Sequence, residues 1–238
     1  MNWVWSRIKA LLEVNYSPEE VFNRNLEGPS WLIPLVVLSL LSVLISVIQA
    51  PIHLEWMSWQ IDAAGAPPSE AAGSLNLMRR SARAGLIAIP ILYLLRWLAH
   101  ALLIWLTTQL FLVQLKFSHI LTIVSYSYLP VAFRDAVICL ILCLRDPALI
   151  RQAEGLNVAV GLNLLFPRVP PPWWTLAASV NLFEVWFVTL LVVGLSVWAR
   201  TRWQKALAIV FPVWVFVALV QVGFVSVGYQ LKSQFTRG

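Results

Sequence analysis

Residues 31–50 read WLIPLVVLSLLSVLISVIQA, a run of twenty residues that contains no charged side chain. A helix needs about 20 mostly apolar residues to cross the hydrocarbon core of a bilayer. The run therefore predicts a transmembrane helix. The residues ahead of it lack the order of a signal peptide, in which a basic stretch precedes an apolar one. We therefore expect the helix to remain as a membrane anchor.

The composition of the whole chain agrees with this prediction. Of 238 residues, 60% are hydrophobic and 12% are charged, and the mean hydropathy is +0.77. Soluble domains average roughly 25% charged residues, so the chain is predicted to be an all-α polytopic membrane protein. The net charge is +6, but most basic residues flank apolar runs, where lipid headgroups hold them. This placement argues against nucleic-acid binding.

Four further apolar runs are long enough to span a membrane. Together with the first, the predicted spans are 31–50, 85–113, 120–144, 175–198 and 206–228, within a membrane domain at 29–238. The polar connection 51–78 is predicted to be a solvent loop, with a short helix in it as the alternative. In the connection 145–174, the terminal RVPPPWW at 168–174 predicts a stiff polyproline-like lead-in with tryptophans at the membrane surface.

The first 28 residues are predicted to form an interfacial or cytoplasmic segment. A helix there would carry an apolar face made of Trp3, Val4, Ile8, Leu11 and Leu12. Such a face predicts an amphipathic helix lying along the membrane. SPEE at 17–20 has a capping serine, a proline at the first helical position and acids in the first turn, so a second short helix is expected to about residue 25.

The distribution of positive charge leaves the orientation almost undetermined. With a cytoplasmic N-terminus, the inner side would carry Arg7, Lys9, Arg24, Lys116, Arg200, Arg202 and Lys205. The outer side would carry Arg79, Arg80, Arg83, Arg145, Arg151, Arg168, Lys232 and Arg237. The dense basic cluster in the short loop 200–205 favours a cytoplasmic N-terminus.

Polar side chains recur at helical spacing inside three of the spans. The second span has one stripe, composed of Tyr93, Arg96, His100, Thr107 and Gln114. The third span has two faces, one with Ser127, Pro130 and Arg134 and the other with Tyr128 and Asp135. In the fourth span, Asn181 and Glu184 face together. A lone charge against lipid costs at least ~2.5–3.5 kcal/mol, so these faces are expected to meet protein or water.

These residues predict an intramembrane polar cluster near mid-membrane, in which Arg96 and Arg134 are balanced by Asp135 and Glu184. The complete predicted cluster is Arg96, His100, Tyr126, Tyr128, Arg134, Asp135, Asn181 and Glu184. Pro130 would free a carbonyl to accept a hydrogen bond from it. The cluster has a structural or partner-docking interpretation, and a second one as a small-molecule, lipid or proton pathway. In a third, the charges extend to the membrane surface and have little role.

Enzyme signatures are absent from the sequence. It contains no Gly-rich phosphate loop, no Gly-x-Ser-x-Gly elbow and no His-Glu-x-x-His. The three histidines are scattered, and Cys139 and Cys143 are four apart, which fits neither a redox motif nor a zinc site. We therefore predict a protein that is not an enzyme and has no cofactor and no metal. An acid–base pair of His100 and Glu184 is the one weak catalytic alternative.

Two motifs resemble the Yip1 family of small five-span membrane proteins. NLEGPSW at 25–31 is similar to the family's Asp-Leu-Tyr-Gly-Pro element before the first span, since Leu26, Gly28 and Pro29 match. YSYLP at 126–130 is similar to its tyrosine-rich, proline-containing motif in the third span. KFS at 116–118 and NLFEVW at 181–186 fit the family's layout.

The resemblance implies an integral membrane protein of trafficking or export assemblies. Eukaryotic members bind Rab-type GTPases, but this chain has a short N-terminal region and departs from the family motif at Asn25 and Glu27. It therefore resembles the prokaryotic branch, and the GTPase partner is not carried over. The expected location is a bacterial cytoplasmic membrane.

The expected function is a non-enzymatic scaffold or accessory role. Its expected partners are membrane lipids and other membrane proteins, including a second copy of the chain, without nucleic acid. The alternative function is a small transporter, channel or lipid-moving protein that uses the charged cluster.

Overall fold

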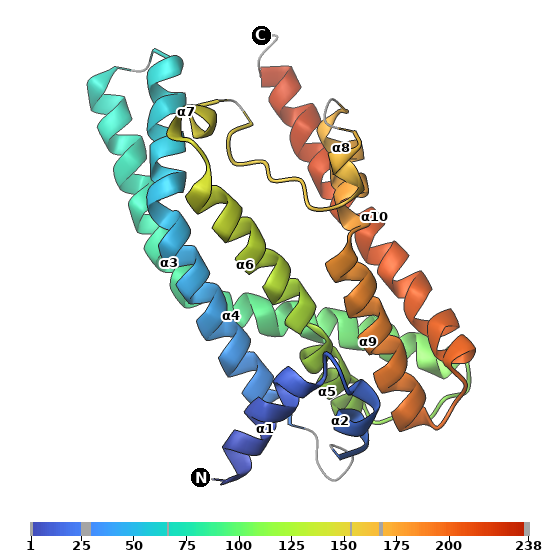
Figure 1. Ribbon diagram of the computed structural model, residues 1–238. Helices are drawn as coiled ribbons and strands as arrows, with labels where there is room; N and C mark the ends of the chain where they lie inside the picture. The colour runs from blue at the N-terminus through green and yellow to red at the C-terminus, as the bar shows by residue number, and fades with distance from the viewer. Residues whose placement is uncertain (1, 25–29, 66, 153, 167–168, 236–238) are drawn as a thin grey trace. The chain divides into compact units, whose positions relative to one another are not determined.

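The computed structural model describes residues 2–24, 30–65, 67–152, 154–166 and 169–235 (Figure 1). These residues are almost entirely helical, and no strand element occurs among them. Five of the described helical segments are long and apolar enough to cross a membrane: Leu32–Ala63, Ala72–Leu110, Phe117–Leu144, Leu182–Ala199 and Trp203–Gln230. The prediction of an all-α polytopic membrane protein with five spans is confirmed.

The described elements follow one another along the chain. They are α1 (Asn2–Glu13), α2 (Pro18–Arg24), α3 (Leu32–Ala63), α4 (Pro68–Leu110), α5 (Phe117–Ser127), α6 (Leu129–Leu144), α7 (Pro147–Ile150), η2 (Leu162–Leu164), α8 (Pro171–Ser179), α9 (Leu182–Ala199) and α10 (Trp203–Phe235). They belong to two compact units. Unit 1 comprises Met1–Pro34, Arg96–Val131 and Ala159–Gly238, and unit 2 comprises Leu35–Leu95 and Ala132–Val158.

Unit 1 is built around α9, which packs against α2, α5 and α10. The indole of Trp198 donates a hydrogen bond to the carbonyl of Phe22 at 2.8 Å, which ties α9 to α2. Gly194 allows this close approach, because a Cβ atom there would lie 2.7 Å from Ile123 Cγ2 and 2.9 Å from Phe22 Cζ. A separate contact joins α8 to α10, and the two helices run side by side in Figure 1.

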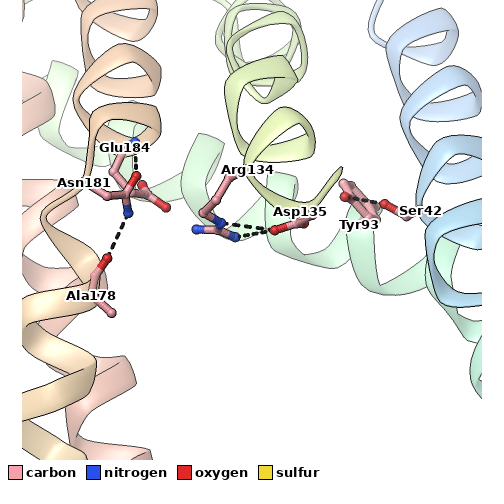
Figure 2. A network of polar contacts seen from close by, with 7 residues as sticks. All are labelled: Ser42, Tyr93, Arg134, Asp135, Ala178, Asn181 and Glu184. Carbon is pink, nitrogen blue, oxygen red and sulfur yellow. Dashed lines mark hydrogen bonds and ion pairs between the residues drawn. The ribbon is translucent and has the colours of Figure 1, made fainter. Parts of the chain in front are cut away.

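In unit 2, α3 and the first part of α4 form a long helical hairpin (Figure 1). The hydroxyls of Ser42 and Tyr93 lie 2.6 Å apart and link the two helices (Figure 2). The segment after α6 also docks on α3. Arg151 forms an ion pair with Glu55 at 2.9 Å, and the Trp56 indole donates to the Gln152 carbonyl at 3.0 Å.

The helices of this hairpin correct one prediction. The expected solvent loop at 51–78 is wrong in extent, because α3 continues through Pro51 to Ala63 and α4 begins at Pro68. Prolines inside apolar helices are tolerated when neighbouring groups satisfy the freed carbonyl. Pro68 stands at the first helical position, where its missing N–H costs nothing. The polarity of 51–78 therefore marked a helical hairpin rather than irregular chain.

The fourth predicted span is also corrected. Residues 175–198 do not form one helix, because α8 ends at Ser179 and α9 begins at Leu182. The predicted polyproline lead-in is wrong from Pro171 onward, since PPWW forms the first turn of α8. Prolines in the first turn of a helix lose no hydrogen bond, so three consecutive prolines can start one.

The N-terminal segment contains the two expected short helices, α1 and α2. One side of α1 buries Ala10 and Leu11, whereas Val4 and Leu12 are exposed. An interfacial placement of α1 stays a prediction. The side chain of Trp3, residues 25–29 of the family-like motif, and Arg168 and Arg237 of the charge count lie outside the described residues.

Candidate functional site

The third span is divided at Tyr128, where α5 ends and α6 begins. Pro130 lacks an N–H, so the carbonyl four residues earlier, that of Tyr126, loses its helical donor. The N–H of Tyr128 donates to this carbonyl instead. The carbonyl that the sequence predicted to be freed is thus satisfied within the break, which turns the Tyr128 side chain into the interior of unit 1.

Tyr128 is the centre of an aromatic cluster in unit 1. Its ring centroid lies 4.9 Å from that of Phe187 and 5.7 Å from those of His100 and Trp97. The ring meets Phe187 and His100 edge-on, the geometry that aromatic quadrupoles favour. Tyr128 is only 1% exposed and Trp97 is fully buried. Together, α4, the α5–α6 break and α9 enclose a buried aromatic core.

His100 supplies the polar part of this cluster. Its Nδ1 lies 2.9 Å from the carbonyl oxygen of Arg96 and 3.4 Å from the hydroxyl of Tyr128. A carbonyl can only accept, so the shorter bond requires the proton to be on Nδ1. His100 itself is 8% exposed. The imidazole is therefore held in one tautomer by its own helix and oriented against Tyr128.

Arg96 lies at the edge of the cluster. Its guanidinium carbon is 5.3 Å from the centroid of the Tyr128 ring, within the range of a cation–π contact. The residue is exposed, unlike its neighbour Trp97. The buried face of α4 consists of Trp97, His100, Ala101 and Ile104. Of the predicted polar stripe, His100 thus lies on the buried face and Arg96 lies beside it, whereas Gln114 falls beyond the end of α4.

Tyr126 points to a different part of unit 1. It is fully buried, and its hydroxyl lies 3.3 Å from the hydroxyl of Ser30. Ser30 directly precedes the first span. The two tyrosines of the YSYLP motif therefore have separate environments: Tyr126 contacts the entry to α3, and Tyr128 contacts the aromatic cluster.

Asn181 and Glu184 lie at the start of α9 rather than at mid-span (Figure 2). The side-chain oxygen of Asn181 accepts from the N–H of Glu184 at 2.9 Å, and its amide donates to the Ala178 carbonyl at 2.8 Å. Asn181 is therefore the N-cap of α9. Glu184 occupies the first turn, where the helix dipole favours a carboxylate. The pair thus stands at the start of the candidate span Leu182–Ala199, and its predicted mid-membrane depth stays a prediction.

The capped turn is fixed by a backbone contact with the preceding loop. Gly161 and Asn181 form an isolated antiparallel bridge, and the N–H of Leu162 donates to the Val180 carbonyl at 3.0 Å. A Cβ atom on Gly161 would lie 2.6 Å from the carbonyl oxygen of Val180. Only glycine fits here. The close backbone contact of Gly161 with Asn181 therefore fixes the connection between α8 and α9.

Arg134 and Asp135 form their own ion pair in unit 2 (Figure 2). One carboxylate oxygen of Asp135 accepts from Arg134 Nη2 at 2.9 Å and from Nε at 3.1 Å. The pair is only partly exposed. Two charges that neutralise each other cost far less in an apolar span than one alone.

The predicted site residues are thus found in distinct local settings. Arg96, His100, Tyr126, Tyr128, Asn181 and Glu184 belong to unit 1, and Arg134 and Asp135 belong to unit 2. A single cluster that unites all four charges stays a prediction. Sequence reasoning missed Trp97 and Phe187, which enclose Tyr128. The spans contain many aromatic residues, so nothing in the sequence distinguished these two as neighbours of Tyr128. The described residues contain no group of three or more His, Cys, Asp or Glu able to hold a metal ion.

Comparison with known proteins identifies a family. The Yip1 domain family model covers residues 12–225. Among curated proteins and among solved structures, none matches the chain. The matched region contains α2 to α9 and most of α10, and hence all or most of each of the five candidate spans. The protein therefore belongs to the Yip1 domain family and is an integral membrane protein.

Proposed function

We propose that the protein is a non-enzymatic membrane scaffold or accessory protein that binds other membrane proteins or lipids. The closed aromatic and polar core of unit 1 carries this proposal. Tyr128, His100 and Asn181 are buried, and their polar atoms contact the protein's own backbone and side chains. Such an arrangement fixes helices relative to one another and offers no free nucleophile or acid–base pair to a substrate.

The outward surface of the spans is where binding would take place. Large apolar side chains are exposed along α9 and α10, among them Leu182, Val185, Phe211 and Phe224. In a bilayer these side chains contact lipid or the helices of a partner. Packing of complementary side chains drives helix association in membranes, because lipid tails are as apolar as leucine. A rigid core with an apolar exterior suits a protein that assembles with other spans.

Native co-purification tests the proposal. The full-length protein is extracted from membranes in a mild detergent, and the co-purifying proteins and lipids are identified by mass spectrometry. A scaffold is expected to retain a defined set of partners in constant ratio. Phe224→Ala on the exposed face should weaken that set without lowering the melting temperature. A chain that emerges alone, with no defined protein or lipid, contradicts the proposal.

The proposed setting is a bacterial cytoplasmic membrane with the N-terminus inside. The turn between α9 and α10, with Arg200 and Arg202, supports this orientation through the positive-inside rule. Thr201→Cys can be tested in a background without Cys139 and Cys143. A membrane-impermeant thiol reagent should label it only after the cells are opened. Labelling of intact spheroplasts would show that this turn, and with it the N-terminus, lies outside the cytoplasm.

A further inference from the structure

A groove of about 770 Å³ lies between α3 and α4 within unit 2. One end of the groove is apolar and includes Val47 on α3, and Leu86 and Ile89 on α4. Its other end is polar and basic, with Arg79 and Arg83 on α4. The groove is separate from the aromatic cluster of unit 1, and no predicted site residue lines it.

The two arginines form a matched pair. Arg79 and Arg83 are four residues apart, so they lie one above the other on the same face of α4. Both are exposed, and among the described residues neither makes a hydrogen bond or an ion pair. The lining contains no acidic residue. Glu55, one residue beyond the lining residue Leu54, is engaged by Arg151. The groove therefore presents uncompensated positive charge at one end.

The position of the groove along the span matches the boundary between acyl chains and headgroups. On α3 the lining runs from Ser46, inside the uncharged run, to Leu54. At 1.5 Å per residue this distance is roughly 12 Å, enough to cover a headgroup and the first part of an acyl chain. Trp56, one helical turn beyond His53, is a residue type that gathers at the membrane–water interface. The basic end therefore faces headgroups, and the apolar end faces acyl chains.

We propose that this groove binds an anionic phospholipid of the surrounding bilayer. The phosphate lies between the guanidinium groups of Arg79 and Arg83, which match phosphate oxygens with paired N–H donors. An acyl chain follows the apolar wall past Leu86. A zwitterionic lipid fits less well, because its ammonium group would meet two cations and no carboxylate. The proposal deepens the proposed function, on which it rests, by naming a ligand class and its place.

The test uses the full-length protein in detergent and native mass spectrometry with added dioleoyl phosphatidylglycerol. Dioleoyl phosphatidylcholine and inorganic phosphate are the comparison ligands. The double variant Arg79→Gln with Arg83→Gln is expected to weaken phosphatidylglycerol binding by about tenfold or more. Arg80→Gln is the matched control, since Arg80 is exposed and adjacent but does not line the groove. It should change the affinity less than about twofold.

A second variant tests whether the lipid occupies the groove. Ala82 lines the groove, so Ala82→Trp fills it without altering charge. It should weaken phosphatidylglycerol binding while leaving the melting temperature unchanged. The proposal is overturned if Arg80→Gln costs as much as the double variant, if phosphatidylcholine binds equally, or if inorganic phosphate alone displaces the lipid.

These outcomes are distinct from failure of the proposed function. Phosphatidylglycerol binding to the purified protein tests the groove without any protein partner. If the double variant loses the lipid but keeps its co-purifying proteins, the groove is a lipid site and the scaffold role stands. If the wild-type chain co-purifies with proteins yet shows no preference for phosphatidylglycerol, the groove proposal fails alone.

Discussion

Units 1 and 2 differ in how far they bury their large side chains. Unit 1 has a core of fully buried aromatic side chains, including Phe22, Trp97 and Tyr126. The helical hairpin of unit 2 leaves large apolar side chains exposed, with Leu40 at 65% and Ile87 at 78%. Burial of an aromatic side chain is a large source of stability. An exposed apolar side chain in a span contacts lipid and contributes little to folding.

The same contrast holds for polar groups. In unit 1 they cap helices or bond to the backbone, as Asn181 and His100 do. In unit 2 the arginines of the groove extend to the surface. The buried core of unit 1 therefore fixes its helices, whereas the groove of unit 2 leaves two arginines exposed. Substitutions in the buried core of unit 1 should therefore change stability, and substitutions in the groove of unit 2 should change lipid binding.

The sharpest challenge to this division is Tyr128→Ala. The substitution empties the space between Trp97, His100 and Phe187, and removal of a buried aromatic side chain typically costs about 3–5 kcal/mol. We expect a large fall in melting temperature and in monodisperse yield, measured by thermal-shift size exclusion in detergent. Tyr128→Phe keeps the ring and should cost much less. Ile87→Ala in unit 2 should have almost no effect, and an equal loss there would break the comparison.

A pair of glycines gives the next largest effect. Gly194→Ala places a methyl group against Ile123 and Phe22, both buried, so it should destabilise the protein by about 1–3 kcal/mol. Gly223→Ala in α10 meets nothing within 4 Å. It should instead stabilise the helix by about 0.5–1 kcal/mol. Opposite shifts in melting temperature are expected from the same chemical change. Shifts of the same sign would contradict the packing of α2 and α5 on α9.

The five spans were predictable because apolar length alone decides whether a segment can cross a membrane. Boundaries were harder, since they depend on backbone hydrogen bonds. Asn181 looked like a polar residue inside a span, but it ends one helix and caps the next. A capping interpretation was available from its Asn-x-x-Glu spacing to Glu184. The apolar residues on both sides obscured it.

The site was only partly predictable for a similar reason. Helical periodicity correctly marked Tyr128 and His100 as inward-facing, but it gave no rotation angle fine enough to exclude Arg96 from the buried face. One residue step turns a helix by about 100°. The sequence predicted that Asp135 and Glu184 balance the two arginines, but it did not single out the pair of Arg134 with Asp135, because adjacent residues do not share a helix face. The length of the arginine side chain overrides that rule.

Removal of the cap of α9 should have a smaller effect than either packing change. Asn181→Ala deletes the acceptor for the Glu184 N–H and should cost about 1 kcal/mol. Asn181→Ser keeps a capping oxygen and should recover most of that stability. Thermal unfolding in detergent measures both variants. A changed set of co-purifying partners at an unchanged melting temperature would show that this polar group serves binding and not folding.

The smallest expected effect concerns the surface of unit 1 outside the spans. Hydrogen bonding from Arg24, with a further contribution from Lys9, holds the pKa of Glu13 below its usual value of 4.5. A lowered folded-state pKa stabilises the protein above pH 4.5, and this contribution is lost as the pH falls through the folded-state value. Melting temperatures of wild type and Glu13→Gln should therefore differ slightly at neutral pH and converge in acid. A difference that grows on acidification would contradict this expectation. It would show that the ionised Glu13 does not stabilise the contact between α1 and α2.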